Sequence, residues 1–243
     1  NHAGDQMNGY ILKPTNFDPS KRYPVVMSQY SGPGSQSVLD KWTIDWEYYL
    51  VSKGFIVACV DGRGTGGRSR AYETSVYMQL GKLETEDQVA GAEYMRTLPY
   101  VDGKHIGIYG WSYGGYETLM AMSTSNGTYQ AGVAIAPVTD WRYYDTIYAE
   151  RFMRTPNENN EGYEQSAPIT HAEKLKGDLL IISGTADDNV HYLNTLQYSA
   201  ALIEAGIQFD TQIYTNKDHH IRGCNTRHHL YTKVCNFFLD KLK

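Results

Sequence analysis

Residues 106–115 read Ile-Gly-Ile-Tyr-Gly-Trp-Ser-Tyr-Gly-Gly, and this stretch decides the fold. It joins a strand-like apolar run to the pattern G-x-S-x-G, and a helix-compatible segment, residues 116–122, follows. In this context the serine lies on a sharp strand-to-helix turn, where glycine at positions 110 and 114 lets backbone segments approach closely. The bare pattern can arise by chance in a chain with 23 glycines, but the flanking segments argue against chance. The sequence therefore predicts Ser112 as a nucleophile.

A nucleophilic serine needs a base to take its proton and a carboxylate to orient that base. In α/β-hydrolases the acid and then the histidine follow the serine, each on a loop at the carboxyl end of a strand. Residues 179–183 form a short apolar run and lead into a loop that contains the adjacent pair Asp187 and Asp188. Residues 209–215 alternate in polarity like an edge strand and lead to the adjacent pair His219 and His220. The pattern alone does not choose within either pair.

Apolar strand patterns alternate with helical patterns along the chain. The expected strands include residues 25–29 and a central strand at residues 55–60, and the expected helices are residues 85–98, 192–205 and 225–242. Such alternation requires crossover connections. We expect the α/β class, an α/β-hydrolase fold with a mostly parallel central sheet and helices on both faces. A chain of 243 residues with 41% hydrophobic content can bury one such core, so residues 1–243 are expected to form one hydrolase domain.

Composition argues against several other functions. The chain has 22 basic and 27 acidic residues without a basic block, so nucleic acid is not an expected partner. No stretch approaches 18 apolar residues, so no membrane span is expected in this chain. The three cysteines are too scattered for a disulfide framework, and no metal-ligand spacing or cofactor motif appears. The glycine-rich run at residues 61–67 lacks the G-K-[ST] ending of a phosphate loop and predicts a structural turn.

Three segments, residues 110–115, 184–191 and 218–219, resemble the catalytic segments of the prolyl oligopeptidase family of serine peptidases, most closely its dipeptidyl-peptidase IV branch. The likeness covers nearly the whole chain. Its other parts are residues 30–33, 61–64 and 141–145. The resemblance implies that Asp187 is the acid and His219 the base. One departure is His220, because the family usually has glycine directly after the catalytic histidine.

The negative charge that develops on the substrate carbonyl oxygen must be met by hydrogen-bond donors. The turn itself supplies one donor, the backbone N–H of Tyr113. The resemblance implies that the second donor is the hydroxyl of Tyr30.

The resemblance also implies a compact aromatic pocket for proline or alanine on the acyl side of the cleaved bond. Its expected lining is Tyr113, Val138, Trp141, Tyr144, Tyr148 and Val190. A rigid aromatic box favours a flat, small, apolar ring and excludes long side chains. The resemblance further implies that Asn189 binds the penultimate carbonyl of the peptide substrate.

Residues 1–5 are neither a signal peptide nor an initiator methionine, so we expect a fragment of a longer polypeptide. In the resembled family a β-propeller precedes the hydrolase domain and carries the glutamates that hold the substrate's amino terminus. The resemblance also suggests a homodimer through the terminal helix and a nearby strand, and export or a periplasmic location in a bacterium.

The expected function is acyl-enzyme hydrolysis that releases N-terminal dipeptides after proline or alanine. A prolyl endopeptidase or a general esterase on the same fold is the first alternative. A catalytically inactive binding domain is the second, and the presence of Ser112, Asp187 and His219 together argues against it.

Overall fold

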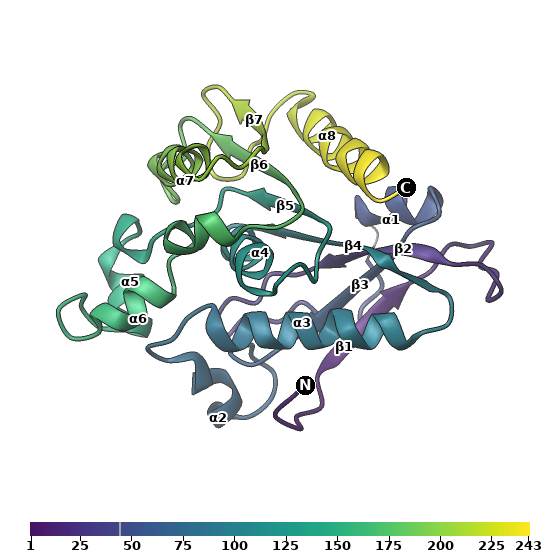
Figure 1. Ribbon diagram of the computed structural model, residues 1–243, viewed down its shortest axis with the longest axis horizontal. Helices are drawn as coiled ribbons and strands as arrows, with labels where there is room; N and C mark the ends of the chain where they lie inside the picture. The colour runs from purple at the N-terminus through teal and green to yellow at the C-terminus, as the bar shows by residue number, and fades with distance from the viewer. Residues whose placement is uncertain (44) are drawn as a thin grey trace.

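The computed structural model describes residues 1–43 and 45–243. Within these residues seven strands form one sheet in the order β1-β3-β2-β4-β5-β6-β7 (Figure 1). The strands are β1 (Asn8–Leu12), β2 (Tyr23–Ser28), β3 (Ile56–Asp61), β4 (Val101–Trp111), β5 (Ala131–Ile135), β6 (Asp178–Gly184) and β7 (Asp210–Tyr214). Only β1, which pairs with β3, is antiparallel to its neighbour in this sheet. The predicted mostly parallel sheet is confirmed.

The helices cover both faces of the sheet, as predicted. They are α1 (Glu47–Ser52), α2 (Arg70–Glu73), α3 (Lys82–Thr97), α4 (Tyr113–Thr124), α5 (Thr146–Met153), α6 (Asn160–Gln165), α7 (Leu193–Glu204) and α8 (Thr226–Lys241). Short 3₁₀ turns are η1 (Thr74–Val76), η2 (Trp141–Tyr143) and η3 (Pro168–Lys174). The three predicted helices correspond to α3, α7 and α8. None of the helices in residues 1–43 and 45–243 is long and apolar enough to cross a lipid bilayer.

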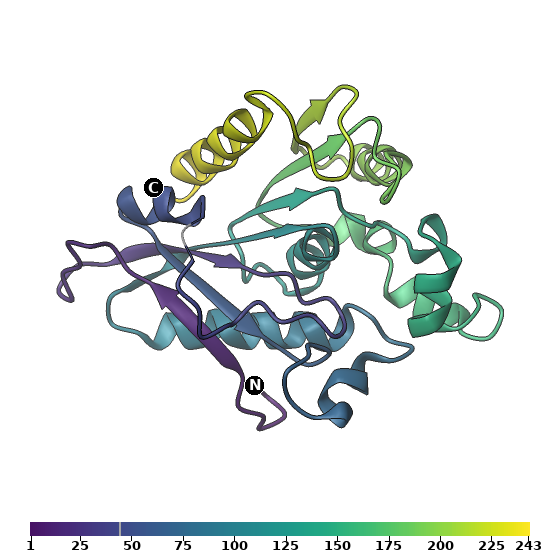
Figure 2. The same cartoon turned by 180° about the vertical axis from the view of Figure 1, so that it is seen from behind.

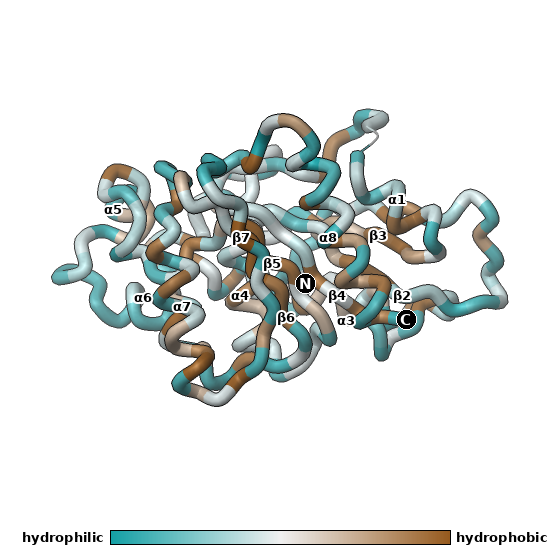
Figure 3. Tube along the Cα trace, turned by 90° about the horizontal axis from the view of Figure 1, so that it is seen from above, coloured by the Kyte–Doolittle hydropathy of each residue, from teal (hydrophilic) through white to brown (hydrophobic). Residues whose placement is uncertain are grey.

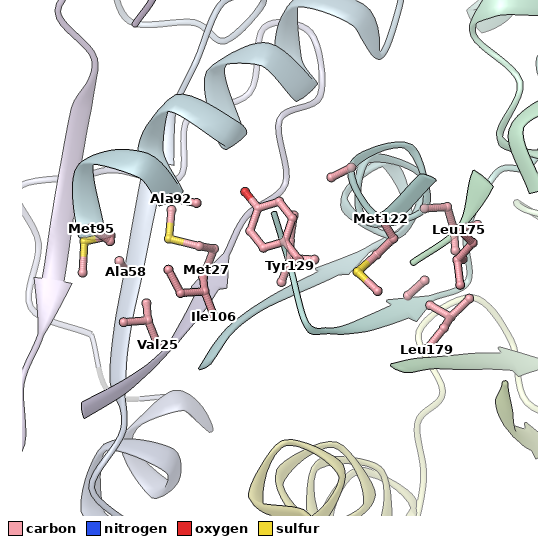
Figure 4. Packing of buried hydrophobic residues seen from close by; sticks show 14 of the residues in the cluster. Val25, Met27, Ala58, Ala92, Met95, Ile106, Met122, Tyr129, Leu175 and Leu179 are labelled. Atoms are coloured by element: carbon pink, nitrogen blue, oxygen red, sulfur yellow. The ribbon is translucent and has the colours of Figure 1, made fainter. Parts of the chain in front are cut away.

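Successive residues of a strand point to opposite faces, and this alternation builds two core layers. Val25 and Met27 of β2 pack toward α3 and α4, whereas Val26 packs toward α1 and α8. Figure 4 shows the first layer, in which Ala92 and Met95 of α3 face the sheet. Figure 2 shows α8 lying beside α1 on the other side. From above, hydrophobic residues concentrate along β5 and β6 (Figure 3).

Two strands were assigned positions in the sheet from their sequence patterns. Residues 209–215 were expected at an edge, and β7 is an edge strand. Residues 55–60 were expected to form a central strand, but β3 is second from the β1 edge. The strand is apolar because β1 and β2 flank it on either side and because its side chains are buried along most of its length.

The glycine-rich run after β3 is a structural turn, as expected. Arg63 in this turn forms an ion pair of 2.8 Å with Asp87 of α3, whose side chain is fully buried. Gly64 has a φ of +91°, which L side chains rarely adopt. The backbone N–H of Gly34 donates to the carbonyl of Gly64, so the turn supports the loop after β2.

The parallel arrangement brings the loops after five adjacent strands to one edge of the sheet. Tyr30 follows β2, Ser112 follows β4, Val138 follows β5, Asp187 follows β6 and His219 follows β7. Ligands of open α/β sheets bind at the carboxyl ends of the strands. The fold therefore gathers residues from widely separated parts of the chain into one candidate site.

Two carboxyl groups are buried between α3 and α4, Glu84 at 1% exposure and Glu117 at 0%. Burial raises the pKa of Glu84 to about 7 and that of Glu117 well above its ordinary value. The Thr85 hydroxyl lies 2.6 Å from the Gly81 carbonyl oxygen and 2.8 Å from Glu117 Oε1. A hydroxyl has one proton and a carbonyl oxygen only accepts, so a neutral Glu117 can donate to the Thr85 oxygen while Thr85 donates to the Gly81 carbonyl.

We expect Glu117→Gln to stabilise the protein relative to wild type more at about pH 8 than at about pH 5. The unfolded Glu117 ionises near its ordinary pKa, whereas the folded group stays neutral, so rising pH favours the unfolded wild-type chain. Each unit of upward pKa shift corresponds to about 1.4 kcal/mol, and glutamine does not ionise. Urea denaturation of both proteins across this range measures the difference in the free energy of unfolding. A difference that is independent of pH would contradict a neutral buried Glu117.

Candidate active site

Ser112 lies at the junction between β4 and α4, on a backbone held by very close contacts. Its φ is +60° and its ψ is −115°, a strained combination for a residue with a side chain. A Cβ at Gly110 would lie 2.1 Å from the carbonyl oxygen of Gly114, and one at Gly114 would lie 2.5 Å from that of Gln29. Only glycine fits at these two positions. The turn therefore projects the serine side chain from the carboxyl end of β4.

The base candidate and the acid candidate are in direct contact. His219 Nδ1 lies 2.7 Å from Asp187 Oδ2, with side-chain exposures of 9% and 1%. The other carboxylate oxygen of Asp187 accepts hydrogen bonds of 2.9 Å from the backbone N–H groups of Asn189 and Val190. These bonds hold the carboxylate of Asp187, which in turn orients the His219 ring and leaves Nε2 as its free nitrogen atom.

The two neighbours that the sequence pattern could not distinguish are placed differently. Asp188 is exposed, and His220 is exposed with its backbone N–H donating to Asp218. The structure brings Asp187 and His219 together and leaves the neighbours outside this contact. Burial of the pair explains the difference, because the loops after β6 and β7 each turn one of two adjacent side chains inward.

Trp111 is a further part of this arrangement that the sequence analysis missed. Its indole Nε1 donates a hydrogen bond of 3.0 Å to the backbone carbonyl of His219. The Arg227 guanidinium of α8 lies 4.6 Å from the centre of the Trp111 ring. Trp111 occupies a variable position of the G-x-S-x-G pattern, and its contact with a loop 108 residues away leaves no local signal. The contact ties the backbone of the His219 loop to the serine turn.

Tyr30 reaches the serine from the loop after β2. Burial raises the pKa of the Tyr30 hydroxyl, and the nearby Ser112 side chain partly opposes this shift. A Cβ at Gly32 would lie 2.5 Å from the Tyr30 ring, so the glycine leaves the ring its space. The residue remains 39% exposed. The Tyr30 hydroxyl therefore stands beside Ser112, at the side of the site that faces solvent.

The Tyr113 backbone N–H is the first of helix α4. The first N–H groups of an α-helix have no partner within the helix. Together with the positive end of the helix dipole, this makes the position suitable for a developing negative charge.

The six residues expected to line the acyl pocket belong to one hydrophobic cluster. They are Tyr113, Val138, Trp141, Tyr144, Tyr148 and Val190. The ring of Trp141 stacks on that of Tyr148 with centroids 5.7 Å apart and meets that of Tyr144 edge-on at 5.9 Å. Tyr144 and Tyr148 are themselves edge-to-face at 5.3 Å. These mutual contacts hold each ring in a fixed orientation.

Helix caps set the positions of the pocket rings. The Asp140 carboxylate accepts from the backbone N–H of Arg142 and begins the turn η2, which contains Trp141. The Asp145 carboxylate accepts from the backbone N–H of Tyr148 and begins α5. An aspartate at the N-cap fixes the start of a helix.

Asn189 joins the pocket to the loop that carries Asp187. Its side-chain oxygen accepts a hydrogen bond of 2.6 Å from the hydroxyl of Tyr144. Both residues line a surface hollow of about 700 Å³, together with Asp145 and Asp188. The side chain is exposed and stands at the rim of the candidate site.

The fold and the serine turn define an α/β hydrolase, and comparisons with known proteins specify the family. The profile of the prolyl oligopeptidase family matches residues 42–243. "Dipeptidyl peptidase 4" of Sus scrofa is 41% identical over 231 residues, which cover 93% of this chain and 30% of that protein. "Prolyl endopeptidase FAP" of Mus musculus is 40% identical over 231 residues, with the same two shares. The crystal structure of Porphyromonas gingivalis dipeptidyl peptidase 4 matches with a TM-score of 0.96 and 57% identity, covering 97% of this chain and 34% of that chain.

The chain belongs to the prolyl oligopeptidase family, and its fold is that of an α/β hydrolase. It spans 24% to 30% of the length of the curated relatives that it matches.

We expect a fluorophosphonate to label Ser112 and no other residue, because the strained strand-to-helix turn presents this serine at the sheet edge that also carries His219. Mass spectrometry of the labelled peptide identifies the site. Ser112→Ala should abolish labelling, and persistent labelling of that variant at another residue would remove Ser112 as the nucleophile.

The histidine pair offers a matched comparison. His219→Ala should lower the rate of phosphonate labelling about a thousandfold or more, because the serine loses its base. His220→Ala should change that rate less than about threefold, as expected for an exposed side chain. The labelling rates of the two variants are measured at the same pH. A larger loss of rate in His220→Ala than in His219→Ala would show that the wrong histidine was assigned as the base.

Proposed function

We propose that this chain is the catalytic domain of a serine dipeptidyl peptidase, which releases N-terminal dipeptides after proline or alanine. The observation that carries the proposal is the buried Asp187–His219 pair at the sheet edge that also presents Ser112 and a closed set of aromatic rings. The catalytic roles are part of the proposal. Ser112 is the nucleophile, His219 the general base and acid, and Asp187 the group that orients His219.

The reaction proceeds in two halves. Ser112 Oγ attacks the carbonyl carbon of the substrate while His219 Nε2 takes the hydroxyl proton. The carbonyl oxygen becomes an oxyanion that accepts hydrogen bonds from the Tyr113 N–H and the Tyr30 hydroxyl. The carbon–nitrogen bond then breaks, and the leaving amine takes the proton from His219. A water molecule, deprotonated by His219, repeats the sequence on the acyl-enzyme, releases the dipeptide acid and restores the serine hydroxyl.

The acyl pocket accounts for the proposed preference. Trp141, Tyr144 and Tyr148 pack on one another. A pocket bounded by such fixed rings suits a proline ring or a methyl group and excludes longer side chains. Burying a small apolar side chain there contributes on the order of 1.5 to 3 kcal/mol. Asn189 at the rim is proposed to donate to the penultimate carbonyl of the substrate.

The proposal extends to parts beyond this chain. We propose that residues 1–243 form one hydrolase domain of a longer polypeptide, and that a β-propeller in it holds the amino terminus of the substrate. The greater length of the relatives supports this reading. A homodimer through α8 and an exported or periplasmic location remain predictions from the family.

A prolyl endopeptidase is the second candidate, and one observation favours it. A relative of 40% identity bears the name "Prolyl endopeptidase FAP". The aromatic pocket suits proline in either case, so the catalytic site of this chain does not separate the two activities. A group that recognises a free amino terminus would separate them.

The substrate preference is tested with p-nitroanilides of Gly-Pro that carry a free or a blocked amino terminus. The full-length protein should cleave the free form at least about tenfold faster in kcat/KM, because a lost charged contact costs about 1.5 to 3 kcal/mol. Residues 1–243 alone should react with phosphonates and activated esters, but turn over the Gly-Pro amide poorly and without preference for a free terminus. Faster cleavage of the blocked form by the full-length protein would establish the endopeptidase instead.

A further inference from the structure

The side chain of Tyr113 is anchored by a buried carboxyl group that the proposed chemistry does not use. The Tyr113 hydroxyl donates a hydrogen bond of 2.7 Å to Glu84 Oε1. Tyr113 is 3% exposed and Glu84 is 1% exposed. The second carboxyl oxygen of Glu84 is buried without a hydrogen-bond partner among the described residues. Neither Glu84 nor Glu117 forms an ion pair with any residue that the structure describes.

A buried tyrosine hydroxyl needs an acceptor, but the acceptor need not be a carboxyl group. In the same core, the Tyr116 hydroxyl donates to the backbone carbonyl of Leu80, and the Tyr129 hydroxyl to that of Gln88. A carboxyl group in this place is unfavourable for stability, as the raised pKa of Glu84 indicates. Costly polar groups are retained in cores chiefly where function requires them.

A structural explanation also exists. Glu84 lies in the first turn of α3, close to the positive end of the helix dipole. A carboxyl group at that position stabilises the start of a helix. This explanation predicts an effect of Glu84 on stability only, and gives no reason for the contact with Tyr113.

The place of Tyr113 connects this contact to the candidate site. The ring centre of Tyr113 is 5.6 Å from that of Trp141 in the acyl pocket and 6.1 Å from that of Tyr30. The backbone N–H of the same residue is the proposed oxyanion donor. A rotation of the Tyr113 ring would therefore displace the pocket wall beside Trp141.

We propose that Glu84 is a positioning residue for the acyl pocket, which holds the Tyr113 ring in the orientation that a bound proline ring requires. The inference rests on the proposed function, because it assigns Glu84 to the site that binds proline. Glu84 acts through Tyr113 and does not touch the substrate. Its effect is larger for substrates that fill the pocket than for small acyl groups that use only the serine and the oxyanion donors.

The test compares the full-length protein with Glu84→Leu, Glu84→Gln and Tyr113→Phe. The substrates are Gly-Pro p-nitroanilide, which fills the pocket, and p-nitrophenyl acetate, which leaves it empty. Glu84→Leu should lower kcat/KM for the anilide about tenfold to a hundredfold, because the buried hydroxyl of Tyr113 loses its acceptor. Hydrolysis of the acetate should change less than about threefold. Glu84→Gln keeps an acceptor and should remain within about threefold of wild type on both substrates.

Two controls separate positioning from general stability. Glu117→Gln alters a carboxyl group of equal burial that does not contact Tyr113, and it should leave both activities unchanged. The double variant Glu84→Leu with Tyr113→Phe should be no slower on the anilide than Tyr113→Phe alone, because each single change removes the same hydrogen bond, the one between Tyr113 and Glu84. Because Tyr113→Phe preserves the shape of the ring, this variant and Glu84→Gln keep the test meaningful even if Glu84→Leu does not fold.

The outcomes are distinct. Three results would overturn the positioning role and leave the proposed function intact. They are equal losses of activity on the two substrates, additive effects in the double variant, and wild-type activity of Tyr113→Phe on the anilide. A wild-type protein that hydrolyses the acetate but not the Gly-Pro anilide would overturn the proposed function, and this inference with it.

Discussion

The close approach of the backbone at the serine turn is the constraint on which the rest of the site depends. Gly110, Gly114 and Gly115 bring the end of β4, the start of α4 and the end of β5 within contacts that no Cβ atom could enter. Because the turn is this tight, Ser112 takes a strained conformation, and the first N–H groups of α4 face the same space as its side chain. The neighbouring loops can then be placed only around this point.

The parallel sheet brings the other candidate site residues to the serine turn. Because β2, β4, β5, β6 and β7 are adjacent and parallel, the loops at their carboxyl ends meet at one edge. Two long-range contacts then hold those loops in register: the carboxylate of Asp187 on His219, and the indole of Trp111 on the backbone of His219. His219 is therefore held from both sides, by the loop after β6 and by the serine turn.

The aromatic cluster around Trp141 is rigid, and buried carboxyl groups lie in the core next to it. The aromatic rings fix one another, and Asp140 and Asp145 fix the starts of the segments that carry them. Behind this wall lie Glu84 and Glu117, whose burial disfavours ionisation. Of the two, only Glu84 contacts a residue of the candidate site, Tyr113, and its proposed positioning role would be gained at the expense of core stability.

The sequence by itself determined the serine turn, the order of acid and histidine after it, the alternation that produces a mostly parallel sheet, and the segments that became α3, α7 and α8. These features follow from local steric limits and from hydrophobic periodicity, which neighbouring residues carry. Only the tertiary structure decided that Asp187 and His219 meet while Asp188 and His220 face solvent, because adjacent residues of a loop differ only in which one the packing turns inward. The same holds for β3, which lies near an edge, and for Trp111 and Glu84, whose partners lie 108 and 29 residues away. Contacts at such separations depend on how the sheet brings distant segments together, and no local pattern records them.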